Sequence, residues 1–513
     1  MKQELLSKKM LFNLLFKERG IKERKTVIQR KTFHFFLKEV YYSKFIFFIK
    51  EIFIMYQIDF HKPLHIHFIG IGGISMSGLA QILLQEDFIV SGSDAKESPL
   101  TDALTQKGAR IFYGQRASNI QDDVEIVVYT AAIHPDNPEF AAAKAKGIPM
   151  LTRAQLLGQI MRNYQTPIAI SGTHGKTTTT SMISQILLEG ACDPTISVGG
   201  ILPSIGGNIR VGQSETFVTE ACEYTNSFLS FFPKISVILN MDADHLDFFK
   251  DIEDIRHSFR RFAQLLPADG TLIINGDTPH YEDIIKDLPC NVITYGIQNT
   301  ADYQATDITY DKYGHASFTV LRDGKKAGSF YLKVPGIHNV SNALAAIALA
   351  QLLQIPDDTI VKGLGSFTGT DRRFQFKGEV GGIHIVDDYA HHPTEIRATL
   401  TAAANYPHKK IWCVFQPHTY TRTKALLPEF AQALTLADHV ILADIYAARE
   451  TNTIGISSAD LQERIQALGT PCEYFPSFDE IENYILSHCA SGDLLITMGA
   501  GDVVRIGEQL LGK

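Results

Sequence analysis

Short apolar runs alternate with helical stretches along most of this chain, and glycine or polar residues stand at the junctions. From Leu64, "LHIHFIGIGGISMSGLAQILLQ" has the pattern of a strand, a glycine turn and a helix, and "FIVSGSD" has the pattern of the next strand. This order is typical of parallel α/β sheets. Ligands of such sheets gather beyond the carboxyl ends of the strands, so we look for chemistry at the strand ends.

The alternation starts afresh twice, which predicts several α/β units. Pro167 opens the strand-like run "PIAISG", which is followed by a loop and the helical stretch "TTTTSMISQILLE". A third start follows "GTDRRF" near residue 370 and continues with "KIWCVFQPH", "HVILADIY" and "DLLITMGAGD". A chain of 513 residues is too long for one compact core. We expect an extension over residues 1–54 and domains over 55–165, 166–369 and 370–513.

The first 54 residues differ in charge from the rest. They contain 13 Lys and Arg against 5 Asp and Glu, whereas the remainder contains 35 against 51. Lysines interrupt their aromatic stretch, so no charge-free run approaches the roughly 20 residues of a membrane span, although a helix lying on a membrane surface stays open. We favour the interpretation that this stretch is not part of the native protein and that Met55 is its first residue.

Charge and cysteine usage exclude several classes of function. The acidic body argues against non-specific nucleic-acid binding, which needs a basic excess. The six cysteines are scattered without a C-x-x-C pair, which argues against a disulfide framework or a structural zinc site and indicates a reducing cytoplasm. Stable membrane insertion is not expected, and the sequence gives no indication of the oligomeric state.

The segment "GIGGISMSG" (70–78) has the layout of a dinucleotide fingerprint, with Asp94 at the end of the following strand. Glycines there let backbone N–H groups approach a pyrophosphate at a helix N-terminus. Ser75 stands where the fingerprint has its third glycine, so the motif indicates a nucleotide diphosphate without separating NAD from a UDP-sugar. A plain tight turn is the alternative.

The segment "SGTHGKTTTT" (171–180) lies between an apolar strand and a helix, as a phosphate-binding loop does. The usual pattern has a glycine five positions before Gly175, but Ile170 stands there. Lys176 would neutralise the β- and γ-phosphates of a nucleotide, and the Thr177 hydroxyl would bind Mg²⁺.

Carboxylates follow two further strands. Glu220 ends one strand, and "ISVILN" delivers Asp242, Asp244 and His245 at its end. Mg²⁺ prefers oxygen ligands, so chemistry alone favours Asp242 or Asp244 as the metal ligand.

The last third of the chain carries "DDYAHHPTEI" and "FQPHTYTRT". The adjacent pair His391 and His392 has no partner at zinc-like spacing, so we do not expect zinc. Arg372, Arg373 and Arg422 suit phosphates and a substrate carboxylate instead. Asp387 and Asp388 could serve either as a structural cap or in catalysis.

Taken together, these motifs resemble the Mur ligase family from about Leu64 to the C-terminus. The resemblance also rests on "EACEYTNSFL", "NMDADHLD" and "PGIHNVSNALAA". It implies an α/β fold of three domains: a Rossmann-like UDP-binding domain, a central P-loop-type ATPase domain with a parallel sheet, and a C-terminal Rossmann-like domain that binds an amino acid. The implied activity is ATP- and Mg²⁺-dependent joining of L-alanine to the carboxylate of UDP-N-acetylmuramate, through an acyl phosphate, for peptidoglycan synthesis in the cytoplasm.

The resemblance also implies roles for residues that match the family's motifs. The catalytic residues are Lys176, His391 and Arg422. The ATP site comprises Gly172, Thr173, His174, Gly175, Lys176, Thr177, Thr178, His338, Asn339, Asn342 and Arg373. The UDP side comprises Gly70, Gly72, Gly73 and Asp94, and the amino-acid pocket Tyr389, His391 and Arg422. The metal ligands are Thr177, Glu220 and His245, which replaces the preference for Asp242 or Asp244.

Alternatives remain at this stage. Some family members have arginine where this chain has Thr419, so Arg422 alone would anchor the amino acid. A related ligase, which joins a tripeptide to UDP-N-acetylmuramate in muropeptide recycling, has a similar loop but tends to differ at "GIGG" and at Tyr389. An NAD(P)-dependent oxidoreductase would leave the ATP loop unexplained. A non-catalytic nucleotide sensor would not need an amino-acid pocket.

Overall fold

The computed structural model of the chain describes residues 57–130, 132–448 and 450–513. Residues Ile58–Lys513 form one compact unit. The expectations about residues 1–54 and about Met55 fall outside the described residues. In the part of the chain that is described, no helix combines the length and the apolar character needed to cross a bilayer.

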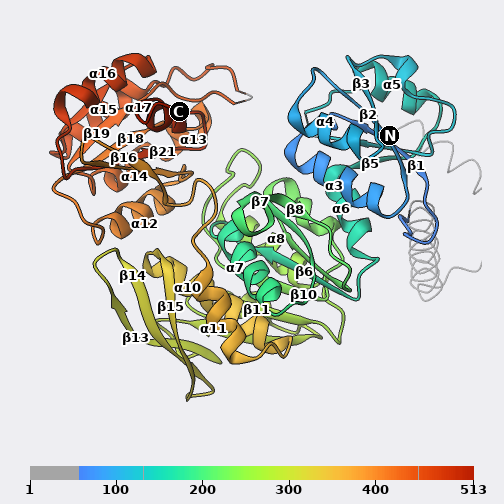
Figure 1. Cartoon of the computed structure of the whole chain (residues 1–513), viewed down its shortest axis with the longest axis horizontal. Coiled ribbons are helices and arrows are strands. Elements are labelled where there is room, and N and C mark those ends of the chain that lie inside the picture. Colours follow the sequence, from blue (N-terminus) through green and yellow to red (C-terminus); the bar gives the residue numbers. More distant parts are fainter. Residues whose placement is uncertain (1–56, 131, 449) are drawn as a thin grey trace, which may run out of the picture. The chain divides into compact units, whose positions relative to one another are not determined.

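The first sheet holds five parallel strands in the order β3-β2-β1-β4-β5. Its strands and helices are coloured blue to teal in Figure 1. The strands are β1 (His65–Ile69), β2 (Ile89–Asp94), β3 (Arg110–Tyr113), β4 (Ile126–Tyr129) and β5 (Met150–Thr152). They alternate with α3 (Ile74–Gln85), α4 (Pro99–Gln106), α5 (Pro138–Ala145) and α6 (Arg153–Met161). The strand order reverses between β1 and β4, which is where doubly wound sheets bind ligands. The glycine turn that follows β1 lies at this point.

The second sheet is larger and mixed. Its ten strands within the described ranges follow the order β15-β14-β13-β12-β11-β10-β6-β9-β7-β8. They are β6 (Thr166–Ser171), β7 (Thr195–Leu202), β8 (Gly207–Arg210), β9 (Thr216–Glu220), β10 (Ile235–Ile238), β11 (Thr271–Asn275), β12 (Asn291–Gly296), β13 (Tyr303–Tyr310), β14 (His315–Arg322) and β15 (Lys325–Pro335). The seven neighbouring strands β13-β12-β11-β10-β6-β9-β7 all pair in parallel, as expected for the central domain. Antiparallel pairs extend both edges, at β7–β8 and through β13, β14 and β15, and the sequence analysis did not predict them.

Helices α7 (Lys176–Glu189), α10 (Ile337–Leu352) and α11 (Asp357–Ser366) belong to the core of this sheet. Helix α10 is rich in alanine, and most of its residues are buried. Gly363 lets α11 approach α7 closely, because a Cβ atom there would lie 2.8 Å from the Cα atom of Ile186. This packing fixes α7, and with it the loop that precedes α7.

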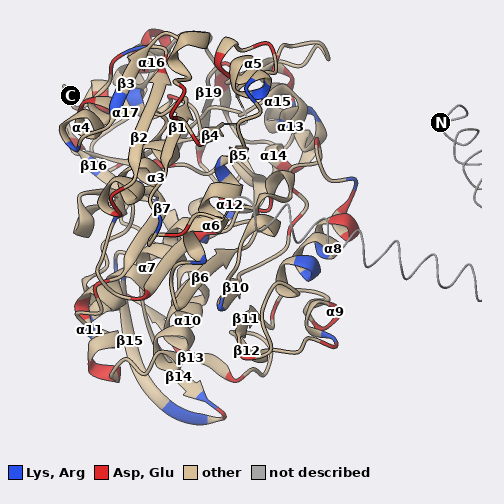
Figure 2. Cartoon of the chain, turned by 90° about the vertical axis from the view of Figure 1, so that its right-hand side faces the viewer, with Lys and Arg blue, Asp and Glu red and all other residues tan. Residues whose placement is uncertain are grey.

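Helix α8 (Ile252–Ala263) begins where the long loop that follows β10 ends. Asp251 caps it by accepting a hydrogen bond from the backbone of Asp254. Acidic residues occupy its first turn, and Arg260 and Arg261 its last, where they complement the helix dipole (Figure 2). The short helix α9 (Tyr281–Ile285) follows β11.

The third sheet has six strands in the described ranges, in the order β16-β17-β21-β18-β19-β20. They are β16 (Gln375–Val380), β17 (Ile383–Asp388), β18 (Ile411–Phe415), β19 (His439–Leu442), β20 (Cys472–Tyr474) and β21 (Leu494–Met498). All neighbours are parallel except β16 and β17. The helices are α12 (Pro393–Ala403), α13 (Tyr420–Ala425), α14 (Leu427–Leu434), α15 (Ser458–Ala467), α16 (Phe478–His488) and α17 (Val504–Leu510). Separate apolar clusters, one containing Phe415 and the other Trp412, pack around this sheet.

The chain therefore has three α/β parts, as expected for the fold class. The first sheet ends at Thr152 and the second begins at Thr166; the second ends at Pro335 and the third begins at Gln375. The proposed boundaries near residues 165 and 370 fall between these sheets.

Candidate active site

The loop between β6 and α7 turns on two glycines in the left-handed region of backbone space. Gly172 has φ of 145° and Gly175, the N-cap of α7, has φ of 85°. A Cβ atom at Gly175 would lie 2.7 Å from Oδ1 of Asn342, so a larger residue would be both strained and crowded. Asn240, after β10, holds the loop from behind: its side chain accepts from the His174 backbone N–H at 2.8 Å and donates to the His174 carbonyl at 3.0 Å. The short loop is thus an ordered turn, held by its two glycines and by Asn240, although it lacks the first glycine of the usual P-loop pattern.

Lys176 folds back over this loop. Its Nζ donates to the carbonyl oxygens of Gly172 and Thr173, at 2.5 and 3.1 Å, and to Oε2 of Glu223 at 2.9 Å. Burial by itself would lower the pKa of Lys176, but the nearby negative groups, Glu223 first among them, together outweigh burial and raise the pKa above its usual value. The ammonium is therefore charged and held at the mouth of the loop, where a phosphate would bind.

The expected metal ligands lie around this lysine. Glu220 Oε1 accepts a 2.5 Å hydrogen bond from the backbone of Gly199, and the next glycine, Gly200, lies against Thr177: a Cβ atom there would be 3.3 Å from Thr177 Cγ2. His245 Nε2 lies 3.8 Å from Oε1 of Glu223. Glu220 and Thr177 thus lie at the adjacent glycines Gly199 and Gly200, and His245 lies beside Glu223, the partner of Lys176.

Glu223 is the residue of this group that the sequence analysis missed. Its side chain is buried, and within the described residues its Oε1 has no hydrogen-bond partner. A buried carboxylate oxygen without a partner is costly, and a bound cation would remove that cost. The hydroxyl, carboxylate and imidazole donors of Thr177, Glu220, Glu223 and His245 therefore fit Mg²⁺, with mostly oxygen ligands.

A cavity of about 440 Å³ opens beside the loop. Its walls contain most of the residues expected around ATP, namely His174, Gly175, Thr178, His338, Asn339, Asn342 and Arg373. Two polar residues at the end of β11, Asn275 within the strand and Asp277 after it, also line it and were not identified from the sequence. Burial first, and then the charge of Arg373, lowers the pKa of His338 to about 4, so this histidine is neutral at neutral pH. A cavity of this size with amide and imidazole groups can accommodate a nucleotide.

The expected amino-acid pocket lies in the C-terminal part. Arg422 Nε donates to Oδ1 of Asp244 at 3.2 Å, and Nη2 lies 3.1 Å from the same oxygen; Nη1 lies 3.3 Å from His418 Nδ1. His391 and His418 lie with ring centroids 5.7 Å apart. Burial lowers the pKa of both histidines to about 4, which leaves Arg422 as the positive group among these residues. Tyr389 stacks beneath the guanidinium groups of Arg372 and Arg373.

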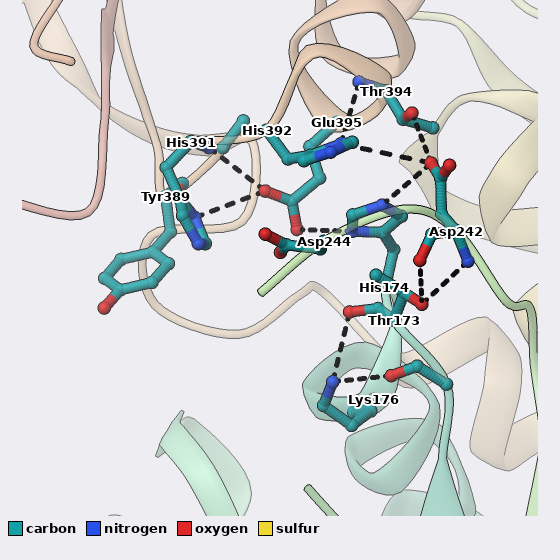
Figure 3. A network of polar contacts seen from close by, with 12 residues as sticks. Thr173, His174, Lys176, Asp242, Asp244, Tyr389, His391, His392, Thr394 and Glu395 are labelled. Carbon is teal, nitrogen blue, oxygen red and sulfur yellow. Dashed lines mark hydrogen bonds and ion pairs between the residues drawn. The ribbon is translucent and has the colours of Figure 1, made fainter. Parts of the chain in front are cut away.

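A network of polar side chains joins the ATP loop to α12 (Figure 3). His174 lies between two carboxylates: its Nε2 is 3.3 Å from Asp242 Oδ2, and its Nδ1 is 3.2 Å from Glu395 Oε1. Thr394 donates to the same Asp242 oxygen at 2.5 Å. Burial opposes the charge of His174, but the two carboxylates raise its pKa to about 9. Neither Thr394 nor Glu395 was singled out from the sequence, since "PTE" reads as an ordinary helix start.

His392 acquires partners that its sequence position does not reveal. A nitrogen of His392, a nitrogen of His174 and an oxygen of Asp242 lie within 4.8 Å of one another. Hydrogen bonds already engage the His392 ring: Nδ1 accepts from the Thr394 backbone at 3.3 Å, and Nε2 donates to the Ala243 carbonyl at 3.2 Å. The three residues thus take part in the polar network.

Asp387 and Asp388 both have structural partners. Asp387 accepts from Arg372 Nε at 3.0 Å and from the Thr497 hydroxyl at 2.7 Å. Asp388 accepts from the backbone N–H groups of Phe374 and Ala390, at 2.8 and 2.7 Å. Arg372 donates further to two backbone carbonyls, so it is committed to the fold rather than available to an anion. These contacts favour the structural alternative for the two aspartates.

The turn after β1 gathers the residues expected on the UDP side. The backbone N–H of Gly72 donates to Asp94 Oδ2 at 2.8 Å, and a Cβ atom on Gly72 would lie 2.8 Å from that oxygen. Gly70 has φ of 85°, and Gly73 is the N-cap of α3. Ser75, in place of the third fingerprint glycine, accepts a 3.0 Å hydrogen bond from Arg153. Asp94 therefore shapes the glycine turn itself.

Three models of Mur ligase domains match the chain: the Mur ligase family catalytic domain over residues 65–165, the Mur ligase middle domain over 170–350, and the Mur ligase glutamate ligase domain over 372–501. A protein of Agathobacter rectalis named UDP-N-acetylmuramate--L-alanine ligase is 63% identical over 459 residues, which cover 90% of this chain and 100% of the relative. The protein of the same name from Lachnospira eligens is 61% identical over 89% of this chain and 100% of the relative.

Solved structures agree with these matches. The UDP-N-acetylmuramate-alanine ligase of Thermotoga maritima superposes with a TM-score of 0.73 at 29% identity, covering 88% of this chain and 98% of that one. A murein peptide ligase of Psychrobacter arcticus superposes with a TM-score of 0.64 at 28% identity, with the same coverage. Since the matched segments span all three sheets and the phosphate loop, the chain belongs to the Mur ligase family.

Proposed function

We propose that this protein joins L-alanine to the carboxylate of UDP-N-acetylmuramate, with ATP as the energy source and Mg²⁺ as the metal, in the synthesis of peptidoglycan precursors. The observation that carries the proposal is the contact between Asp244 and Arg422. Asp244 directly precedes His245 of the expected metal site, so that site and the amino-acid pocket meet at one place. Relatives of 61 and 63% identity that carry the name of the alanine-adding ligase support alanine as the amino acid.

The reaction is an amide formation from an unreactive carboxylate. The carboxylate oxygen takes the γ-phosphoryl group of ATP, which releases ADP and leaves an acyl phosphate. The alanine nitrogen then attacks the acyl carbon, the bond from carbon to the phosphate oxygen breaks, and the amine loses a proton to solvent. Each step moves negative charge between phosphate oxygens, which positioned cations stabilise.

The chain's own residues supply that positioning. Lys176 faces the transferring phosphate from the loop formed by Gly172, Thr173, His174 and Gly175, with Thr178 behind it. Thr177, Glu220 and His245, together with Glu223, would hold Mg²⁺, which neutralises phosphate charge when bound. His338, Asn339, Asn342 and Arg373 surround the nucleotide, and Gly70, Gly72, Gly73 and Asp94 receive the UDP group.

The amino-acid pocket consists of Arg422, Tyr389 and His391. Arg422 takes the alanine carboxylate, for which a guanidinium fork is suited. The rings of Tyr389 and His391, whose centroids lie 5.5 Å apart, would lie beside the attacking amine. The reaction takes place in the cytoplasm under this proposal, in keeping with six cysteines that are all unpaired.

The test is phosphate release with ATP, Mg²⁺, UDP-N-acetylmuramate and L-alanine, omitting each in turn. We expect release only when all four are present. Release that ignores alanine or UDP-N-acetylmuramate would refute the proposal, and preference for a tripeptide over alanine would identify a recycling ligase. A Lys176→Ala protein should lose roughly 10²-fold or more in turnover.

A further inference from the structure

Glu395 joins the two halves of the proposed site. It is the third residue of α12, and its two carboxylate oxygens face different partners. Oε2 accepts from the backbone N–H of His391 at 3.0 Å and lies 3.3 Å from His391 Nδ1. Oε1 lies 3.2 Å from Nδ1 of His174, in the ATP loop (Figure 3). One side chain thus spans from the amino-acid pocket to the phosphate loop.

Helix capping accounts for only one of these oxygens. A glutamate in the first turn commonly reaches back to the backbone N–H groups that precede the helix, and Oε2 does this at His391. The capping role leaves Oε1 free to face solvent. Instead, the Glu395 side chain is only 14% exposed, beside a His174 side chain that is 13% exposed. A carboxylate so buried needs a charged partner, and His174 supplies it.

Two neighbouring hydrogen bonds also join the start of α12 to the loop that follows β10. Thr394 donates to Asp242, and His392 donates to the carbonyl of Ala243. These two bonds come from the residues on either side of Pro393 and do not involve Glu395. The start of α12 is therefore seated on the loops after β6 and β10 by three independent side chains, of which Glu395 alone also contacts the pocket residue His391.

We propose that Glu395 is a positioning residue that sets His391 in the amino-acid pocket by anchoring it to His174 of the ATP loop. The proposal rests on the proposed function, because it assigns alanine to the pocket of His391 and ATP to the loop of His174. The pocket reaches its binding geometry only when α12 is seated on the loop, so alanine binding depends on the contact between Glu395 and His174.

Glu395→Gln tests this contact with little change of shape. The amide oxygen can still accept from the His391 backbone, but the neutral amide cannot form an ion pair with a protonated His174, so the charged contact between the two residues is lost. We expect the KM for alanine to rise tenfold or more, while the KM for UDP-N-acetylmuramate stays within twofold. Glu429→Gln, at an exposed glutamate in the first turn of α14, is the matched control and should leave all constants unchanged.

A double-mutant cycle with His174→Asn separates positioning from simple loss of the cap. If Glu395 acts through His174, the Asn substitution should add less than twofold to the alanine KM in the Glu395→Gln background. Additive effects, or an equal rise of all three KM values, would overturn the proposal and reduce Glu395 to a helix cap.

The contact between Glu395 and His174 can also be tested by a measurement that does not depend on enzymatic turnover. NMR titration of the His174 ring should give a pKa near 9 in the wild type, and Glu395→Gln should lower it towards that of an ordinary histidine. The facing groups Asp242, Thr394 and His392 remain in both proteins. Wild-type protein without alanine-dependent turnover would refute the proposed function. The contact would then be judged by the His174 titration, and an unchanged pKa in Glu395→Gln would overturn it.

Discussion

The guanidinium of Arg422 and the carboxylate of Asp244 form an ion pair of 3.1 Å between α13 and the loop that follows β10. Both side chains are largely buried, and 178 residues of chain separate them. The residue expected to take the alanine carboxylate is therefore already held by a carboxylate of the protein, one residue before the expected metal ligand His245. This pair orients Arg422 before any substrate binds.

Removing that carboxylate should loosen Arg422. In Asp244→Asn the arginine keeps its contact with His418 but loses its charged partner, so we expect the KM for alanine to rise by about tenfold. Steady-state kinetics with varied alanine measures this, with Asp358→Asn, at an exposed aspartate of α11, as the control. A lower KM in Asp244→Asn would show that Asp244 competes with the substrate rather than orienting Arg422.

Glu223 should determine the metal requirement. Its Oε1 is buried without a hydrogen-bond partner among the described residues, with only His245 Nε2 at 3.8 Å, and an amide at this position would bind a cation less well. We expect Glu223→Gln to raise the Mg²⁺ concentration for half-maximal turnover by roughly 10- to 100-fold, and EDTA to abolish turnover.

Glu215→Gln, at an exposed glutamate just before β9, is the matched control for this substitution. An unchanged Mg²⁺ requirement in Glu223→Gln would show that Glu223 does not bind the metal and serves only as the partner of Lys176.

Gly175→Ala should damage the ATP loop specifically. The new methyl group would meet Asn342 Oδ1 at 2.7 Å, in a backbone conformation with φ of 85°. We expect a stability loss of about 1–3 kcal/mol and a higher KM for ATP. Gly206→Ala, where φ is 64° but nothing lies within 4 Å, should show the strain without the effect on ATP. Equal KM values in the two variants would argue against a role for this close approach.

Stability should fall on the alkaline side because of His174. Its pKa is raised to about 9 in the folded protein, so the protonated ring stabilises the fold fully below the ordinary histidine pKa of about 6.5. That contribution is lost as the pH rises from about 6.5 through 9, and a shift of this size corresponds to about 3 kcal/mol. Urea unfolding at several pH values should show this decline in the wild type and a weaker one in His174→Gln. Parallel curves would contradict the assignment.

Much of the site could be predicted from strand ends and motifs. The apolar runs predict where β1, β6, β10 and β21 end, because a buried parallel strand needs a continuous apolar stretch. The placement of Lys176, Glu220 and His245 at neighbouring strand ends follows from that pattern. The antiparallel strands β13 to β15 escaped prediction, because their half-exposed faces carry no comparable signal.

The sequence by itself determined the family, the three α/β parts and the local chemistry of the phosphate loop, since these depend on short stretches whose pattern is legible in the chain. Only the tertiary structure decided which side chains meet across those parts. Glu223 beside Lys176, Asp244 on Arg422 and Glu395 on His174 are separated by 47, 178 and 221 residues, and no periodicity records such contacts. Burial then makes these pairs costly to break, because a carboxylate removed from water must pair with whichever cation the fold brings to it.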